Sequence, residues 1–353
     1  MATALDSSLE TPAGMAVEVD KIDRELKKLW EQSGEMMTRA SLINLAVYSE
    51  EPGMLAKNTE LISRLTEKNA CRAIVIGLNP NAQESRVAAW ISAHCHVSRA
   101  GSKQICSEQL SFSIDGASTA LLTNVVFSHL DSDLPLYFWW QGEFHDPMDP
   151  QLFAWIDRLI YDSRLWKNFD DQIRRVEIAQ EEAKQRVVLC DLNWLGIVQL
   201  RLALAQFFDC SDARAHLSQI SGVEIEYAPG FRSTAILLLG WLAAQIGWQA
   251  GESSGGEIRF RAGEKTVSAL LNETAGQAIS RLVVRSGSTE FCVLHAPNSQ
   301  SLDVTVFQEG TPQMNQLMPA GKSDVGSLLS EELMRGGPHR VYLRAINCVR
   351  QLL

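Results

Sequence analysis

The sequence lacks the features that mark membrane proteins and nucleic-acid-binding proteins. Its longest apolar run, residues 235–244, is far shorter than the roughly 18 residues that a membrane-spanning helix needs. Its formal net charge is −10, whereas nucleic acids and anionic membrane surfaces attract proteins with a basic face. We therefore expect neither a membrane nor a nucleic acid as a partner.

The sequence also lacks a secretory leader and a disulfide pattern. Residues 1–14 contain no basic segment followed by an apolar core. The seven cysteines are scattered singly, and an odd number without regular spacing does not indicate a disulfide framework. These absences predict a cytoplasmic protein whose thiols are reduced.

The motifs of nucleotide-binding loops and serine nucleophiles are incomplete. Residues 320–323 (AGKS) resemble the end of a P-loop, but Gln316 stands where the first glycine is required. The strand predicted to end before Pro80 carries no G-x-G-x-x-G, and the G-x-S-x-G match at residues 251–255 follows a predicted helix instead of a strand. There is also no nucleophile with a base, so the sequence predicts no catalytic residues and no cofactor.

The composition and the order of predicted elements indicate a globular protein of two domains. The chain has 353 residues, of which 46% are hydrophobic and 21% are charged. Strands alternate with helices as far as residue 210, which is typical of an α/β domain with a mostly parallel sheet. Alternating segments with short turns then indicate an antiparallel sheet, at residues 258–261, 265–271, 278–285, 290–295 and 301–308. We predict a disordered lead-in over residues 1–15, an α/β domain over 16–210 and a smaller α+β domain over 211–353.

A short aromatic run, residues 134–140 (LPLYFWW), predicts a buried strand in the first domain. Trp140 ends this run, and Gln141 and Glu143 follow it. Open α/β sheets bind ligands beyond the carboxyl ends of their strands, so these three residues are candidates for a binding crevice. The alternative is that the aromatic residues only fill the core.

Later strands are followed by polar residues in the same way. Asp162 follows the strand predicted at residues 158–161, and Asp191, Asn193 and Trp194 follow the strand at 186–190. We expect them to join the same crevice, which would bind a small molecule or form part of a partner face. The alternative is that Asp191 and Asn193 only cap the helix that follows.

One cluster has the residue types of a metal site, namely His94, Cys95 and His96 together with Cys106. On a strand His94 and His96 share one face while Cys95 points to the other, so the ligands do not converge and we predict no metal. Cys95 and Cys106 flank a predicted hairpin at residues 99–102 and could form a redox pair. A reducing compartment favours two reduced core cysteines instead.

Several of these segments, in this order, resemble the OpcA family of glucose-6-phosphate dehydrogenase assembly proteins. The matching segments are His94-Cys95 followed by Gly101, Cys106-Ser107-Glu108, Asp133-Leu134-Pro135 with Trp139-Trp140, and Asp191-Leu192-Asn193-Trp194. The resemblance covers most of the chain and is sharpest before residue 210. The last segment has only Cys348, so the thiol regulation of some relatives is not carried over.

The resemblance implies a non-enzymatic, cytoplasmic, bacterial protein of the oxidative pentose phosphate pathway. Such a protein binds glucose-6-phosphate dehydrogenase and promotes its assembly or activates it allosterically. The alternative is an α/β enzyme or sensor that binds a sugar phosphate or a nucleotide at the strand-exit crevice.

Overall fold

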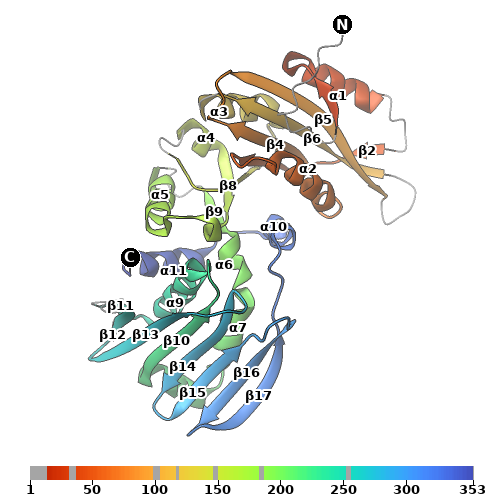
Figure 1. Cartoon of the computed structure of the whole chain (residues 1–353). Coiled ribbons are helices and arrows are strands. Elements are labelled where there is room, and N and C mark those ends of the chain that lie inside the picture. Colours follow the sequence, from red (N-terminus) through yellow and green to blue (C-terminus); the bar gives the residue numbers. More distant parts are fainter. Residues whose placement is uncertain are drawn as a thin grey trace. The chain divides into compact units, whose positions relative to one another are not determined.

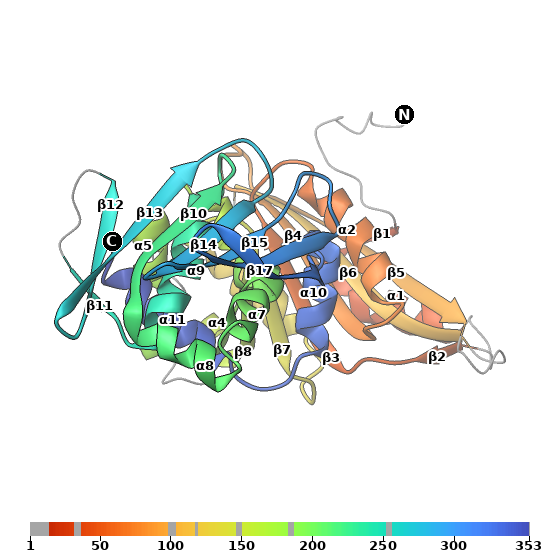
Figure 2. The same ribbon diagram turned by 90° about the horizontal axis from the view of Figure 1, so that it is seen from below.

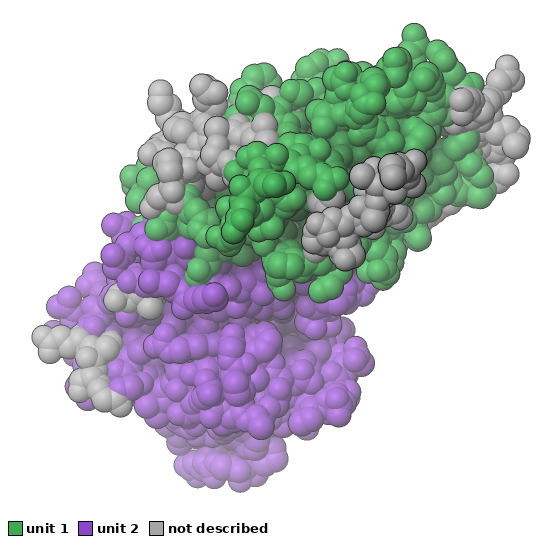
Figure 3. All heavy atoms as spheres, turned by 45° about the horizontal axis from the view of Figure 1, so that its top comes forward, with its two compact units in different colours: residues 1–161, 175–190, 329–337 green, residues 162–174, 191–328, 338–353 purple. Residues whose placement is uncertain are grey.

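The computed structural model describes residues 14–31, 37–97, 104–116, 119–145, 150–182, 187–251 and 256–352. The chain folds into two compact units, each made of several stretches (Figure 3). Unit 1 comprises residues 1–161, 175–190 and 329–337, and unit 2 comprises residues 162–174, 191–328 and 338–353. The predicted single boundary at residue 210 is therefore wrong. The helix at residues 198–206 precedes the predicted boundary and yet packs on the sheet of unit 2.

Unit 1 is built on a mostly parallel sheet, as predicted (Figure 1). Its strands β6, β4, β3, β7 and β8 are parallel neighbours in this order, and β5 and β1 add antiparallel strands beside β6. Strand β2 also pairs with β6, and β9 follows β8 at the other edge. The strands are β1 (Met15–Val17), β2 (Met37–Arg39), β3 (Ile43–Ser49), β4 (Cys71–Asn79), β5 (Arg86–Val97), β6 (Gln104–Asp115), β7 (Leu136–Trp140), β8 (Ile156–Tyr161) and β9 (Val188–Asp191).

Helices cover both faces of this sheet, which explains why β3 is buried along its whole length. Side chains alternate along β6, so that Phe112 and Gln109 lie on opposite faces. Phe112 stacks on His129 of α3 (Thr119–His129), while Gln109 donates to Thr59 of α2 (Met54–Leu65). The other helices of unit 1 are α1 (Ile22–Glu31) and α4 (Pro150–Trp155).

The aromatic run forms β7 between β3 and β8, so the prediction of a buried strand is confirmed. The predicted lead-in lies outside the described residues except at its end. There the prediction is wrong, because Met15 begins β1 and pairs with Ile91 of β5.

Unit 2 contains a sheet of mostly antiparallel strands, in the order β11, β12, β13, β10, β14, β15, β16 and β17. One pair departs from the predicted antiparallel sheet, since β10 and β13 are parallel. The strands are β10 (Ile220–Tyr227), β11 (Gln249–Ala250), β12 (Glu257–Ala262), β13 (Lys265–Glu273), β14 (Ile279–Ser286), β15 (Thr289–Leu294), β16 (Ser301–Gln308) and β17 (Thr311–Pro319).

Helices α7 (Val198–Gln206) and α9 (Arg232–Ile246) pack on the sheet of unit 2, and α11 (Arg340–Arg350) packs on α9. Helix α9 thus lies between the sheet and α11 (Figures 1 and 2), which is why it is apolar all round. A Cβ at Gly240 would overlap the Val349 side chain, so glycine permits this close contact. Unit 2 also contains α6 (Leu192–Gly196), α8 (Ser211–Arg214), and the 3₁₀ turns η2 (Ser163–Leu165) and η3 (Ala215–Gln219).

The remaining helices, α5 (Phe169–Glu182) and α10 (Val325–Met334), contribute residues to both units, and the short turn η1 (Val19–Lys21) precedes α1. Among the described residues, no helix combines the length and the apolar character needed to cross a membrane.

Candidate functional site

The predicted crevice residues are divided between the two units. Trp140, Gln141 and Glu143 belong to unit 1, whereas Asp162, Asp191, Asn193 and Trp194 belong to unit 2. Each group has its own geometry, and a shared crevice stays a prediction.

In unit 1, Trp140 holds the loop that leaves β7. Its side chain is buried, its ring lies 4.5 Å from that of Tyr48, and its Nε1 donates to the backbone oxygen of Glu143 at 3.0 Å. Trp140 therefore serves the core, as the alternative interpretation expected, and also fixes the position of Glu143.

Gln141 ties the same loop to α2. Its side-chain amide and that of Asn58 exchange two hydrogen bonds, each of 2.9 Å. Its backbone N–H donates to the oxygen of Tyr48 at 2.9 Å and so continues the pairing of β7 with β3. Gln141 and Glu143 are both half-buried, so that part of each side chain reaches the surface.

The carboxylate of Glu50, the residue that follows β3, completes this surface. Glu50 accepts from the hydroxyl of buried Tyr48, and its other oxygen lies 3.3 Å from Nε2 of exposed His145. Burial and the neighbouring Glu50 carboxylate raise the pKa of the Tyr48 phenol, so that its proton stays in place. We call Glu50, Gln141, Glu143 and His145 the strand-exit face. It offers acidic and hydrogen-bonding groups on a rigid base.

In unit 2, Asp191 is the centre of a buried polar cluster. Its carboxylate accepts from the N–H of Ser163 at 3.1 Å, the hydroxyl of Ser163 at 2.8 Å and the N–H of Asn193 at 2.9 Å. The hydroxyl of Tyr342 lies 3.3 Å from the same carboxylate. Asp191 is 1% exposed and caps α6, so the capping interpretation is confirmed.

Asn193 extends this cluster. Its amide nitrogen donates to the Ser163 hydroxyl at 2.8 Å, and its oxygen accepts from the Thr234 hydroxyl at 2.7 Å. Asp162 is also buried, and its carboxylate pairs with the guanidinium of Arg164. Because these polar groups bond one another below the surface, a binding role for Asp162, Asp191 or Asn193 stays a prediction.

The surroundings of Asp191 shift its titration. Burial, aided by the negative charge of Asp162, raises the pKa of Asp191 to about 7, although the hydrogen bonds from Ser163 and Asn193 act in the opposite direction. The cluster thus contains a carboxyl group that titrates near neutral pH.

Trp194 faces the interior of unit 2. It is 3% exposed, the guanidinium of Arg201 lies 3.4 Å from its ring centre, and the Tyr342 ring packs at 5.4 Å. These contacts are those of a core residue with a cation–π partner. A role for Trp194 in binding stays a prediction.

Cys95 and Cys106 face each other on β5 and β6 and form a disulfide. The expectation of two reduced cysteines is therefore wrong for this pair, because the strand register places them directly opposite. His94 Nε2 lies 2.9 Å from Gln109 Oε1 and His96 Nε2 lies 3.2 Å from Thr66 Oγ1, so both rings have protein partners. The hairpin at residues 99–102 lies outside the described residues, and a response to redox state stays a prediction.

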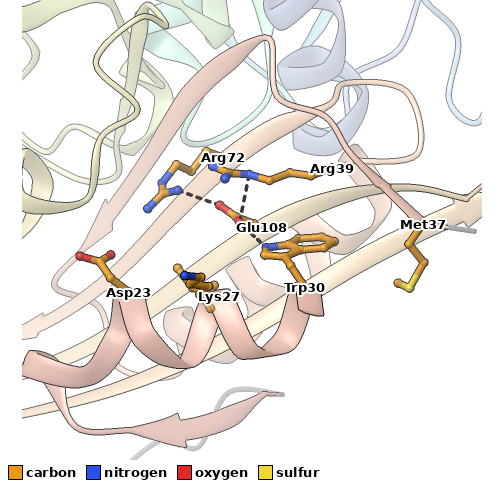
Figure 4. A pocket seen from close by; sticks show the side chains of 8 residues that line it. Asp23, Lys27, Trp30, Met37, Arg39, Arg72 and Glu108 are labelled. Atoms are coloured by element: carbon orange, nitrogen blue, oxygen red, sulfur yellow. Dashed lines mark hydrogen bonds and ion pairs between the residues drawn. The ribbon is translucent and has the colours of Figure 1, made fainter. Parts of the chain in front are cut away.

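A pocket in unit 1 was not predicted from the sequence (Figure 4). It has a volume of about 460 Å³ and opens between α1 and the strands β2, β4 and β6. Its lining residues are Asp23, Leu26, Lys27, Trp30, Met37, Arg39, Arg72 and Glu108. Two charged residues within apolar strands, Arg72 and Glu108, are the signal in the sequence that could have indicated it.

Comparison with known proteins gives the family. A model described as the N-terminal domain of a glucose-6-phosphate dehydrogenase subunit matches residues 62–178, and the model of the C-terminal domain matches residues 187–346. A Nostoc punctiforme protein named OxPP cycle protein OpcA is 28% identical over 201 residues, which is 56% of this chain and 42% of that protein. Its namesake from Synechocystis is 25% identical over 322 residues, covering 82% of this chain and 65% of that protein.

The chain is thus an α/β protein of two compact units. Its N-terminal and C-terminal parts match the two domains of one kind of subunit. It belongs to the OpcA family of glucose-6-phosphate dehydrogenase subunit proteins. The matched part spans between two fifths and two thirds of the two relatives' own length.

Solved structures show only a distant likeness. The aldose-aldose oxidoreductase of Caulobacter crescentus is 10% identical, with a TM-score of 0.47 over 87% of this chain and 94% of that one. A likeness of this size carries no inference about activity.

Proposed function

We propose that this chain is a non-enzymatic partner of glucose-6-phosphate dehydrogenase that promotes the assembly of the enzyme or activates it. The match of the N-terminal and C-terminal subunit domains, in order and over most of the chain, carries this proposal. The names of the relatives, which refer to the OxPP cycle, support the same metabolic setting.

The contact with the enzyme is proposed at the strand-exit face. This surface lies at the carboxyl ends of β3 and β7, where open α/β sheets present their binding groups. Glu50 and Glu143 give it negative charge, and Trp140 and Asn58 hold the loop that carries Glu143 and Gln141. Complementary charge at such a face steers association and fixes orientation.

An activator of this kind works by binding the active state of the enzyme more tightly than the inactive state. A difference of about 1–3 kcal/mol between the two states changes activity or substrate affinity by roughly 5- to 150-fold. The chain therefore needs no catalytic group of its own.

The test is to measure the kinetics of the same organism's glucose-6-phosphate dehydrogenase with and without this chain, together with the mass of the complex by size-exclusion light scattering. We expect a larger mass together with a lower KM or a higher kcat. An increase in mass without a kinetic change would reduce the role to that of a structural subunit. If neither mass nor kinetics changes, the proposed function is refuted.

A further inference from the structure

The pocket between α1 and the sheet of unit 1 has the size and the enclosed polar groups of a small-molecule site. Its volume of about 460 Å³ falls within the range of roughly 300–1,000 Å³ that is usual for ligand pockets. None of its lining residues belongs to the strand-exit face or to the Asp191 cluster.

Glu108 organises the floor of the pocket. It is 1% exposed, and its carboxylate accepts from Nε1 of Trp30 and from Nη1 of Arg72 at 2.7 Å. It also forms an ion pair with Arg39, whose Nε lies 3.0 Å away. These three side chains approach Glu108 from α1, β2 and β4 (Figure 4). One carboxylate therefore holds two guanidinium groups in fixed positions.

A purely structural role for Arg72 explains only part of its hydrogen-bonding capacity. Its Nε donates to the backbone oxygen of His129 at 2.6 Å, and its Nη1 donates to Glu108. Within the described part of the chain, no acceptor is bound to Nη2, although Arg72 is only 8% exposed. Nη2 is not among the fully buried unsatisfied atoms of the described residues, so it can be reached from the pocket and can donate to a ligand there.

The charges of the lining favour an anion at this position. The lining contains three positive residues, Lys27, Arg39 and Arg72, and two negative residues, Asp23 and Glu108. The lining therefore has an excess of one positive charge, whereas the whole chain has a net charge of −10. Outside the lining, the guanidinium of Arg39 lies 3.9 Å from half-exposed Asp131. Arginine pairs bind planar or tetrahedral anions through several hydrogen bonds at once.

The remaining lining residues suit the body of a small metabolite. Leu26, Met37 and the indole of Trp30 supply apolar surface, and Asp23 lies at the exposed mouth on α1. A carboxylate in this position can accept hydrogen bonds from hydroxyl groups but would repel a second anionic group. We propose that this pocket binds a small hydroxylated organic anion, with its phosphate or carboxylate group between Arg39 and Arg72 and its body against Trp30.

The test is isothermal titration of the full chain, without any dehydrogenase, against glucose 6-phosphate, inorganic phosphate, gluconate and uncharged glucose. We expect saturable binding of glucose 6-phosphate or gluconate, and no binding of glucose. Tighter binding of glucose 6-phosphate than of gluconate would identify a phosphate ester as the ligand, and the reverse would identify a carboxylate. Binding of none of the three anions, or equal binding of glucose, would overturn the proposal.

Variants link the binding to this pocket. Arg39→Gln, whose side chain is 43% exposed, should weaken anion binding at least tenfold, and Lys27→Gln should weaken it about threefold. The matched control is Lys28→Gln, because Lys28 is the next residue on α1 and pairs with Glu25 instead of lining the pocket. If Lys27→Gln and Lys28→Gln have equal effects, the binding is general surface attraction and the proposal is wrong. Because no enzyme is present, this result does not depend on the proposed function.

Discussion

Asp191 shows how one buried residue couples the fold to pH. An aspartate in an unfolded chain has a pKa of about 3.9, whereas burial raises the pKa of Asp191 to about 7. Between these values the folded state binds one proton more than the unfolded state. The contribution of Asp191 to the free energy of unfolding should therefore fall as the pH rises from about 4 to about 7, and it should become constant above that range.

The substitution Asp191→Asn should remove this dependence. Asparagine imitates the protonated carboxyl and can still accept from the backbone N–H groups of Ser163 and Asn193. We expect the difference in unfolding free energy between the native chain and the variant to change by about 3–4 kcal/mol between pH 4 and pH 8. Urea unfolding at several pH values measures it.

The control for this change is Asp209→Asn, because Asp209 is exposed and should leave the native pH dependence intact. If Asp191→Asn and Asp209→Asn give the same pH profile as the native chain, Asp191 does not titrate as inferred.

Single residues were predictable where their role is local. Asp191 follows a strand and precedes a helix, and an aspartate in that place caps the helix whatever the rest of the fold. Arg72 and Glu108 were not predictable as a pair, because they meet only through the register of β4 against β6. No local rule gives that register.

The disulfide links two elements, β5 and β6, and can be tested at that scale. Cys95 and Cys106 are opposite each other, and the other five cysteines are free. A thiol reagent should therefore count five thiols in the denatured, unreduced chain and seven after reduction. A count of seven before reduction would show that the bond is absent from the purified protein.

The same bond should contribute to stability. It closes a loop with a sequence separation of 11, for which the chain-entropy model gives about 2–3 kcal/mol. We expect the double variant Cys95→Ser, Cys106→Ser to lose about this much unfolding free energy, and reductant to have no further effect on it. Exposed Cys210→Ser is the control and should change neither the stability nor its response to reductant.

Elements were predictable where their apolar pattern is strong. The aromatic strand β7 and the apolar helix α9 both stand out in the sequence, and both form. Strand β17 was missed because most of its residues are exposed and it carries two prolines, so that it has no alternating pattern. The parallel pairing of β10 with β13 was missed as well. These strands are separated in the sequence by α9, β11 and β12, and such a long crossover allows parallel pairing that a series of short turns does not.

At the scale of the whole molecule, the sequence predicted the two kinds of sheet but not the path of the chain between them. Residues 162–174 and 191–210 precede the predicted boundary and yet belong to unit 2. Helix α7 explains this result, because it packs on β15 and β16, which lie about a hundred residues later in the sequence. Contacts between segments so far apart in the sequence depend on which apolar surfaces the neighbouring elements leave exposed. The composition of a segment does not reveal those surfaces.

The whole molecule is also the scale at which the strand-exit face can be tested against the enzyme. Glu143→Arg reverses a charge on this face but keeps the backbone oxygen that accepts from Trp140, so the loop should remain in place. We expect the variant to bind glucose-6-phosphate dehydrogenase several-fold more weakly, because a reversed charge at a complementary interface slows association. Titration of the enzyme with each variant, followed by its kinetics, measures this change.

The matched control is Glu264→Arg, which makes the same change of charge in the exposed turn between β12 and β13. The two variants have the same net charge, so any general electrostatic effect on the enzyme must be equal for both. A larger loss with Glu143→Arg places the contact at the strand-exit face. Equal losses, or none with Glu143→Arg while the native chain still activates, would move the contact elsewhere on the chain and leave the proposed function standing.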